Sequence, residues 1–205
     1  MPDTIASSSL LNSAITALSE GHVVALPTET VYGFACDARD PQALRRLFEL
    51  KGRPQNVPLP VALAEPSWAE AWQKTPDARV DRLAKRWWPG PLTIVVEAAP
   101  GVSEILSAGL GTVALRVPDQ PITLEIIASL GRAVALTSAN RHGEPPATSA
   151  DAIRRGFPEG VAVVVDGGPS PLGVPTTLVA LEAARQWRVL RAGGVSEAEL
   201  RSLLG

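Results

Sequence analysis

The sequence has little of what several common protein classes require. Cys36 is the only cysteine among 205 residues, so no disulfide can form within the chain. The two histidines, His22 and His142, fit no zinc-binding spacing and give weak support for a histidine acid/base pair. No run of 18 apolar residues occurs, so we expect no membrane-spanning helix.

The start of the chain argues against secretion, and its net charge argues against a general attraction to nucleic acid or membrane. The opening residues, MPDTIASSSLL, lack the basic start and the apolar stretch of a signal peptide, so we expect a soluble cytoplasmic protein. The 19 basic and 21 acidic residues give a net charge of -2. That balance provides no general attraction to nucleic acid or membrane, although it is compatible with a local basic patch.

The strongest nucleotide and hydrolase motifs are missing as well. The sequence contains neither G-x-x-x-x-G-K-[ST] nor G-x-G-x-x-G, and it has no G-x-S-x-G serine elbow. Its polar residues are better suited to binding and orienting charged substrates than to a covalent mechanism.

The hydrophobic content and the alternation of expected strands and helices predict an α/β fold. Hydrophobic residues make up 45% of the chain, enough for the core of one domain, and we expect a single domain over residues 1–205. About eight strands alternate with about seven helices, but not every strand pair has a helix between its members. We therefore predict an open, mixed sheet with helices on its faces. The expected strands are 22–26, 59–63, 92–97, 112–117, 133–136, 161–166, 177–181 and 186–191.

Helices are expected where apolar residues recur at helical spacing. Asp40 and Pro41 suit the start of a helix that runs to Leu50, because aspartate caps free amides and proline fits the first turn. Thr148 and Asp151 resemble a capping box. The other expected helices are 9–19, 77–88, 121–130 and 196–203.

Four polar segments each follow an apolar strand or a helix, and ligands usually bind at strand ends in α/β sheets. Two arginines inside or closing strands, Arg116 and Arg191, add to them. The segments are PTETVYG (27–33), KGRP (51–54), TSANRHGEPP (137–146) and GVPTTL (173–178).

Each segment also has an ordinary structural explanation. PTETVYG and TSAN can be turns, and KGRP can be a basic helix end favoured by the helix dipole. Arg116 can be half of an internal ion pair, and Arg191 can be an exposed strand end. The functional alternative is a site for a polar small molecule, with arginine and lysine clamping phosphates.

The motifs together resemble one family. LPTETVYGFACDA, ELKGRPQNVPL, RWWPGPLTIVV, TVALRVPDQP, LTSANRHGEPP, PTTLVAL and VLRAGG occur in the order seen in the YrdC-like threonylcarbamoyl-AMP synthases. The resemblance covers roughly residues 10–195 and is to the short form of the family. It implies a YrdC-like open twisted sheet that is curled around a concave basic cavity.

The resemblance also implies an activity. Such a synthase converts L-threonine, bicarbonate or CO2, and ATP to threonylcarbamoyl-AMP and pyrophosphate, and Mg²⁺ accompanies the ATP. The product serves threonylcarbamoyl-adenosine (t6A) modification of tRNA, so a transient tRNA or tRNA-modifying transferase partner is expected, and no membrane partner.

Site residues follow from the same resemblance. Thr30, Arg116, Leu136 and Thr176 are expected to bind threonine, with Arg116 on its carboxylate. A second group is expected to contact the nucleotide, and its first two members, the basic pair aimed at the phosphates, are also expected to be catalytic. This group is Lys51, Arg53, Thr112, Ser138, Asn140 and Arg191.

Two other functions remain as alternatives. A non-catalytic RNA-binding paralogue would use the basic concavity, although the chain has only five Trp, three Phe and one Tyr for base stacking. A carbamoyl-transfer relative would use carbamoyl phosphate.

Three residues depart from the pattern of the long-form members of the family. Val57, Ala62 and Pro146 stand where those members have Asn, His, and Ser or Thr.

Overall fold

The strands join into a nine-stranded sheet in the computed structural model, which describes residues 8–183 and 186–205. Their order across the sheet is β7-β1-β2-β6-β3-β5-β4-β8-β9. The neighbours β1/β7, β3/β5 and β4/β8 run parallel, and the other five pairs are antiparallel. The predicted open mixed sheet is therefore confirmed. The expectation of no signal peptide rests partly on residues 1–7, which lie outside the described residues.

The strands follow the β-branched and apolar runs of the sequence. In chain order they are β1 (Val24–Leu26), β2 (Gly33–Asp37), β3 (Val61–Ala62), β4 (Leu92–Glu97), β5 (Thr112–Arg116), β6 (Val134–Ser138), β7 (Val163–Val164), β8 (Thr177–Leu181) and β9 (Trp187–Arg191).

Helices fill most of the connections between these strands. They are α1 (Ser8–Ser19), α2 (Pro41–Lys51), the 3-10 helix η1 (Pro66–Trp72), α3 (Ala78–Trp87), α4 (Glu104–Ser107), α5 (Pro121–Leu130), α6 (Ala150–Gly156) and α7 (Glu197–Leu204). Across the part of the chain that the structure describes, no helix has both the length and the apolar character needed to cross a membrane.

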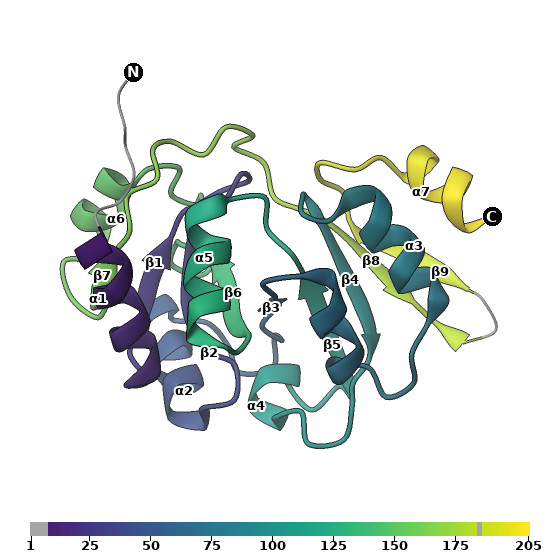
Figure 1. The fold of residues 1–205 in the computed structure, drawn as a ribbon, viewed down its shortest axis with the longest axis horizontal. Coiled ribbons are helices and arrows are strands. Elements are labelled where there is room, and N and C mark those ends of the chain that lie inside the picture. The colour runs from purple at the N-terminus through teal and green to yellow at the C-terminus, as the bar shows by residue number, and fades with distance from the viewer. Residues whose placement is uncertain (1–7, 184–185) are drawn as a thin grey trace.

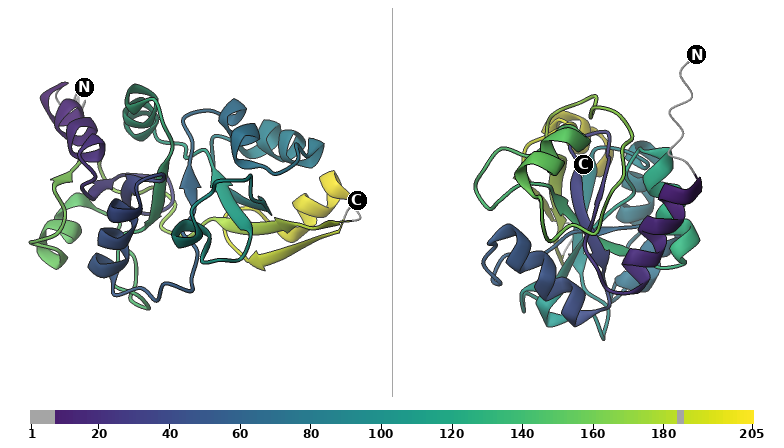
Figure 2. Two further views of the ribbon diagram at one scale, coloured as in Figure 1. Left: turned by 90° about the horizontal axis from the view of Figure 1, so that it is seen from below. Right: turned by 90° about the vertical axis from the view of Figure 1, so that its left-hand side faces the viewer.

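Helices lie on both sides of the sheet (Figures 1 and 2). On one side, α1 and α5 pack together, and their buried Leu18, Ile126 and Ile127 meet strand residues such as Val24 and Leu26. A larger apolar cluster includes residues of α2, α3, α6 and α7. Burial on two faces keeps the strand ends between the helices at fixed positions.

Helix α2 delivers two of the predicted site residues, and its ends are set by its sequence. The Asp40 side chain accepts a hydrogen bond from the Gln42 amide, and Pro41 occupies the first turn. Gly52 ends the helix at φ 58°, a left-handed conformation that suits glycine. The chain therefore leaves α2 directly after Lys51 and reaches Arg53 in an irregular segment.

Several elements differ from the sequence-based expectation. Strand β2 was not predicted, because GFACD is buried at all five positions and shows no alternation of apolar and polar residues. The expected strand over 161–166 is paired only at β7. The expected capping box at Thr148 and Asp151 is wrong. Ser149 caps α6 instead, through a hydrogen bond from the Ala152 amide. Helices η1 and α4 were also missed.

Candidate functional site

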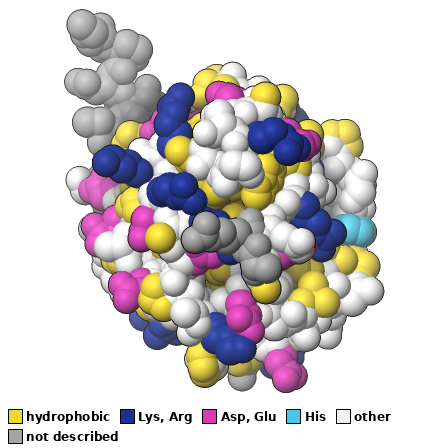
Figure 3. All heavy atoms as spheres, turned by 90° about the vertical axis from the view of Figure 1, so that its right-hand side faces the viewer, with side chains coloured by type: hydrophobic (Ala, Val, Ile, Leu, Met, Phe, Trp, Pro, Cys, Tyr) yellow, Lys and Arg dark blue, Asp and Glu magenta, His cyan; other side chains and the backbone are white. Residues whose placement is uncertain are grey.

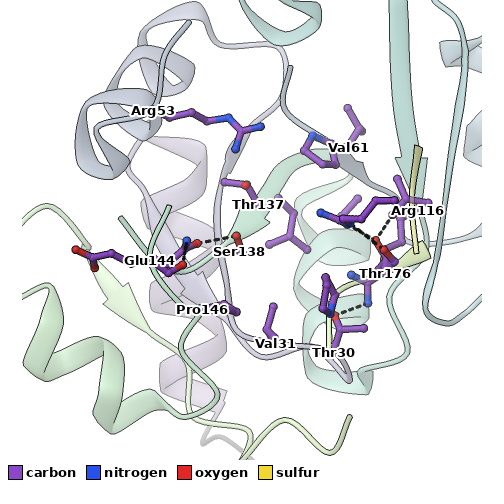
Figure 4. Close-up of a pocket in the computed structure, with 17 residues that line it drawn as sticks. Thr30, Val31, Arg53, Val61, Arg116, Thr137, Ser138, Glu144, Pro146 and Thr176 are labelled. Carbon is purple, nitrogen blue, oxygen red and sulfur yellow. Dashed lines mark hydrogen bonds between the residues drawn. The ribbon is translucent and has the colours of Figure 1, made fainter. Parts of the chain in front are cut away.

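A cavity of about 320 Å³ opens where several strand ends and loops converge (Figure 4). The β1–β2 loop, the segment after α2, and the ends of β5, β6 and β9 all contribute to its wall. The connection from β7 to β8, which crosses one end of the sheet in Figure 1, adds Pro175 and Thr176. Segments far apart in the sequence therefore form one hollow.

Most of the residues predicted for the site line this cavity. Lys51 and Thr112 are the two that do not, and Thr93, Glu144 and Pro146 line the cavity without having been predicted as site residues. The predicted residues in the wall are Thr30, Arg53, Arg116, Leu136, Ser138, Asn140, Thr176 and Arg191.

Arg116, at the end of β5, is held by three protein oxygens. Its Nη2 lies 2.6 Å from Glu29 Oε2 and donates to Thr30 Oγ1 at 3.1 Å, and its Nε donates to the Gly90 carbonyl at 3.2 Å. Burial lowers the pKa of this guanidinium, and the charge of Glu29 acts in the opposite direction. Arg116 is therefore both half of an internal ion pair and part of the cavity wall.

Glu29 supports this arginine from behind the wall. Its Oε2 also accepts a hydrogen bond from the Asp119 amide at 3.1 Å. Its Oε1 is buried and has no hydrogen-bond partner among the described residues. Glu29 occurs within the motif PTETVYG but was not predicted as a site residue. Its position directly before Thr30 was the available signal.

Arg191, at the end of β9, is fixed on Thr176. Its Nε donates to the Thr176 carbonyl at 3.1 Å and its Nη2 donates to Thr176 Oγ1 at 2.9 Å. Thr93 Oγ1 lies 2.8 Å from the same hydroxyl. Burial, and then the charge of Arg116, lower the pKa of Arg191. Thr93 was not predicted, because a threonine inside LTIVVE is an ordinary strand residue.

Arg53 approaches the cavity from the segment after α2. Its Nε donates to the Val57 carbonyl at 3.2 Å and its Nη2 to the Pro58 carbonyl at 2.8 Å. Burial, and then the charge of Arg191, lower the pKa of Arg53. The two positive charges repel each other across the cavity, so an anion placed between them would be stabilised.

Lys51 lies behind the cavity wall and holds a loop of that wall. Its ammonium donates to the Ser138 carbonyl at 2.5 Å, to the Asn140 carbonyl at 2.8 Å and to Asn140 Oδ1 at 3.0 Å. Only 2% of the residue is exposed. Burial, and then the charge of Arg53, lower the pKa of Lys51 to about 8. Direct contact with ATP phosphates stays a prediction.

The loop after β6 is stiffened by its own side chains. Ser138 Oγ donates to Asn140 Oδ1 at 2.6 Å. Asn140 Nδ2 donates to the carbonyls of Arg141 at 2.8 Å and Glu144 at 2.6 Å. These bonds, together with Lys51, keep one side of the cavity in a fixed shape.

Thr112 is not brought to the cavity. It is the first residue of β5 and pairs with Glu97, whereas Arg116 is the last residue of the same strand. At about 3.3 Å per residue, the two positions are roughly 13 Å apart along the strand. The cavity therefore gives no support to the expected nucleotide contact at Thr112.

The protein is an α/β protein with arginines and hydroxyls around one hollow at strand ends of an open mixed sheet. Such a set of side chains suits anionic ligands. The chain belongs to the Sua5/YciO/YrdC family, whose model, described as telomere recombination, matches residues 16–193. The family resemblance expected from the motifs is confirmed.

Relatives with known names agree with this membership. A threonylcarbamoyl-AMP synthase of Pyrococcus abyssi is 38% identical over 190 residues, which are 92% of this chain and 55% of that protein. Another, of Alkalilimnicola ehrlichii, is 35% identical over 175 residues, 85% of this chain and 91% of that protein. This chain thus spans about half the length of the Pyrococcus relative.

A solved structure repeats the fold. The crystal structure of Pyrococcus abyssi Sua5 complexed with L-threonine superposes with a TM-score of 0.91 at 38% identity. The match covers 95% of this chain and 57% of that one. The predicted fold class is therefore confirmed by comparison as well as by the sheet topology.

Proposed function

We propose that this chain is an L-threonylcarbamoyladenylate synthase. It joins L-threonine, bicarbonate or CO2, and ATP into threonylcarbamoyl-AMP and pyrophosphate. The observation that carries the proposal is the shared cavity of Arg53, Arg116 and Arg191, beside the hydroxyls of Thr30 and Thr176. A carboxylate and a triphosphate both need such cations, and an amino acid also needs neutral hydrogen-bonding groups.

The reaction requires little chemistry from side chains. The amine of threonine attacks CO2 and loses a proton, which gives a carbamate. A carbamate oxygen then attacks the α-phosphorus of ATP, and pyrophosphate leaves. The protein holds two anions close together, which can contribute up to about 7–11 kcal/mol in ideal cases, and fixed cations offset their repulsion.

We assign the threonine end to Thr30, Arg116, Leu136 and Thr176, which all line the cavity. The nucleotide end is assigned to a second group, in which Lys51 acts by holding the loop after β6. That group is Arg53, Ser138, Asn140, Arg191 and Lys51.

Mg²⁺ is proposed to enter with ATP. Within residues 8–183 and 186–205, no group of three or more His, Cys, Asp or Glu could hold a metal ion. Phosphate oxygens are hard ligands of the kind that Mg²⁺ prefers, and it often keeps most of its other ligands as water. The ion would neutralise part of the triphosphate charge.

The wider setting follows from this activity. We propose that residues 1–205 act as one YrdC-like domain in the cytoplasm and that the product goes to t6A modification of tRNA. The handover partner would be tRNA or a tRNA-modifying transferase. A face dedicated to RNA is not evident at the β9/α7 end, where basic and acidic side chains are interspersed (Figure 3).

A pyrophosphate-release assay tests the proposal. Purified protein with ATP, bicarbonate and threonine should release pyrophosphate, and Arg53→Ala and Arg116→Ala should each abolish the release. Arg132→Ala is the matched control, because Arg132 pairs with Asp37 at 2.6 Å outside the cavity. Wild-type protein that releases no pyrophosphate would rule the proposal out.

Two further measurements identify the alternatives. Carbamoyl phosphate in place of threonine would sustain turnover only in a carbamoyl-transfer relative. Tight RNA binding with a steep salt dependence, and no ATP turnover, would instead indicate the non-catalytic paralogue.

A further inference from the structure

A second hollow lies apart from the first cavity, the one that contains the proposed substrate site. Its volume is about 310 Å³, close to the 320 Å³ of the first cavity, and within the described residues the two share no lining residue. Its wall contains Arg39 after β2, Trp72 at the end of η1, and Gly101 and Ser103 after β4. We call it the Arg39 hollow.

Strand β2 separates the two hollows. Its first residue, Gly33, pairs with Ser138 of the first cavity, and its last residue, Asp37, lies two positions before Arg39. At about 3.3 Å per residue, the two ends of β2 are roughly 13 Å apart. In Figure 1, α4, which directly follows Ser103, lies at the lower end of the molecule, and the β7–β8 connection beside the first cavity crosses the upper end. The Arg39 hollow is therefore a separate feature of the fold.

The Arg39 guanidinium lies over the indole ring of Trp72. Its central carbon is 5.7 Å from the centroid of the ring, and only 5% of Trp72 is exposed. A guanidinium that contacts a ring through its face keeps the N–H groups at its edge for other partners. Within residues 8–183 and 186–205, no hydrogen bond or ion pair uses the side chain of Arg39. The arginine is thus held near one position with its N–H groups unused.

The carboxylates next to Arg39 in the sequence already bind other groups. Asp37 Oδ2 accepts from Arg132 Nε at 2.6 Å, and Asp37 Oδ1 accepts from the backbone amide of Arg39 at 2.8 Å. Asp40 Oδ1 accepts from the Gln42 amide at 2.8 Å. Among the described residues, none that lines the hollow carries a carboxylate. The positive charge of Arg39 is therefore not neutralised within the wall.

Other residues of the wall add unused donors. The Trp72 indole N–H and the Gly101 amide donate no hydrogen bond within the part of the chain that the structure describes. Ser103 Oγ accepts from the Ile105 amide at 3.2 Å, and among the same residues its hydroxyl hydrogen has no acceptor. A wall that offers a guanidinium and several N–H and O–H donors, but no carboxylate, suits an oxyanion.

The rest of the wall is apolar. It consists of Ala38, Ala71, Pro100 and Val102. Sites for small molecules begin at about 300 Å³ and are mostly apolar, with a few polar groups that fix the orientation of the ligand. The Arg39 hollow has this composition, so its ligand should carry an apolar body beside its anionic group.

We propose that the Arg39 hollow is a second binding site of this protein and that it takes a small organic oxyanion. The anionic group, a phosphate or a carboxylate, binds the edge of the Arg39 guanidinium, and the apolar body contacts the alanine, proline and valine side chains. An arginine already held over a ring loses less conformational freedom on binding than a free one. The proposal goes beyond the reaction of the first cavity and does not depend on it.

The indole signals of the tryptophans test the proposal. Heteronuclear NMR spectra of the nitrogen-labelled full chain should contain five indole signals, and Trp72→Phe assigns that of Trp72. Phenyl phosphate and benzoate are the probes, and the one that binds tighter identifies the anionic group. It should shift the Trp72 signal saturably, whereas phenol, which has no anionic group, should not. The indoles of Trp88 and Trp187 donate to backbone carbonyls and serve as internal controls.

Variants of Arg39 test its role. Arg39→Gln should weaken binding of the tighter probe by at least about tenfold, because charge-assisted hydrogen bonds are lost. Arg39→Lys should also weaken it, since an ammonium lacks the planar fork of a guanidinium. Arg45→Gln is the matched control, because it removes the same charge from an exposed position outside the hollow, and it should keep the wild-type dissociation constant. Thermal unfolding of each variant shows that it is folded.

One more variant separates the two hollows. Arg53 lines only the first cavity, so Arg53→Ala should leave the Trp72 shift unchanged. Loss of the shift in Arg53→Ala would mean that the probe acts from the first cavity, and the proposal would be wrong. It is equally overturned if neither probe gives a saturable shift, if Arg39→Gln leaves the shift intact, or if Arg45→Gln removes it as well. Arg39 would then only cover the ring of Trp72. The pyrophosphate assay decides the proposed function separately.

Discussion

Each arginine of the cavity wall is held by protein oxygens, and Arg116 alone has a carboxylate within 4 Å among the described residues. A buried charge that loses its partner is strongly destabilising. We therefore expect Glu29→Ala to lower the free energy of unfolding by about 3–5 kcal/mol, as measured by urea denaturation. Asp151→Ala, which removes one of the two carboxylate partners of the exposed Arg154, should cost less than about 1 kcal/mol. Similar losses in both variants would show that the Glu29 pair is not structural.

The burial of Lys51 should make the free energy of unfolding depend on pH. Its pKa is about 8 in the folded chain and near 10.5 in the unfolded one. Between these values the unfolded chain binds more protons at this position, so the free energy of unfolding rises with pH. The free energy of unfolding of the wild-type protein minus that of Lys51→Met should increase by roughly 3 kcal/mol from pH 7 to 10.5. Urea denaturation at several pH values measures this, and a difference that falls with pH contradicts the burial.

At the scale of single side chains, the sequence identified the arginines of the site but not which strand threonines reach it. Arg53, Arg116 and Arg191 were identifiable because guanidinium groups beside apolar or stiff segments need an anionic or carbonyl partner. Thr93 and Thr112 both look like ordinary strand threonines in the sequence. Only the three-dimensional sheet decides that Thr93 reaches the cavity and that Thr112 does not.

Among the elements, the close approach of the segment after β9 to the segment that leads into β8 sets the position of Thr176. A Cβ on Gly193 would overlap the backbone of Pro175, Thr176 and Thr177. Gly193→Ala must therefore displace this segment, and a displacement of about 1 Å can cost on the order of a hundredfold in rate. We expect such a loss in threonine-dependent pyrophosphate release. Gly156→Ala is the control, because nothing lies within 4 Å of its Cβ, and it should retain full activity.

Elements with local signals were predictable to within a few residues. Helix α5 begins at Pro121 and ends before Gly131, and strands β4 and β8 match their β-branched runs at both ends. Strand β2 was missed because its pairing with β1 and β6, not its composition, makes it a strand. Short β7 likewise depends on its parallel neighbour β1.

In the assembled protein, the site is a property of long-range packing. Arg53 follows α2, Arg116 ends β5 and Arg191 ends β9, so only the folded sheet brings their charges together. The sequence could indicate that these arginines serve one site through the order of its motifs. It could not give the hydrogen bonds that hold them, because those depend on carbonyls such as Gly90 and Pro58.

The shared cavity makes a final prediction about polyanions. A ligand that binds only the folded state at a hundred times its dissociation constant adds about 2.7 kcal/mol to the free energy of unfolding. For a protein of this size, that corresponds to a rise in Tm of roughly 5–10 °C. We expect inorganic tripolyphosphate to produce such a rise, as measured by differential scanning fluorimetry. Arg53→Ala and Arg191→Ala should each remove most of it.

Two controls decide whether the cavity is responsible. Arg132→Ala should keep the full rise, because Arg132 carries the same charge but pairs with Asp37 away from the cavity. Raising the salt concentration to about 1 M shortens the Debye length to roughly 3 Å and should reduce the rise most for weak surface binding. If all three arginine variants lose the rise equally, tripolyphosphate responds only to net charge. The arginines of the cavity wall, Arg53, Arg116 and Arg191, would then not act as one site.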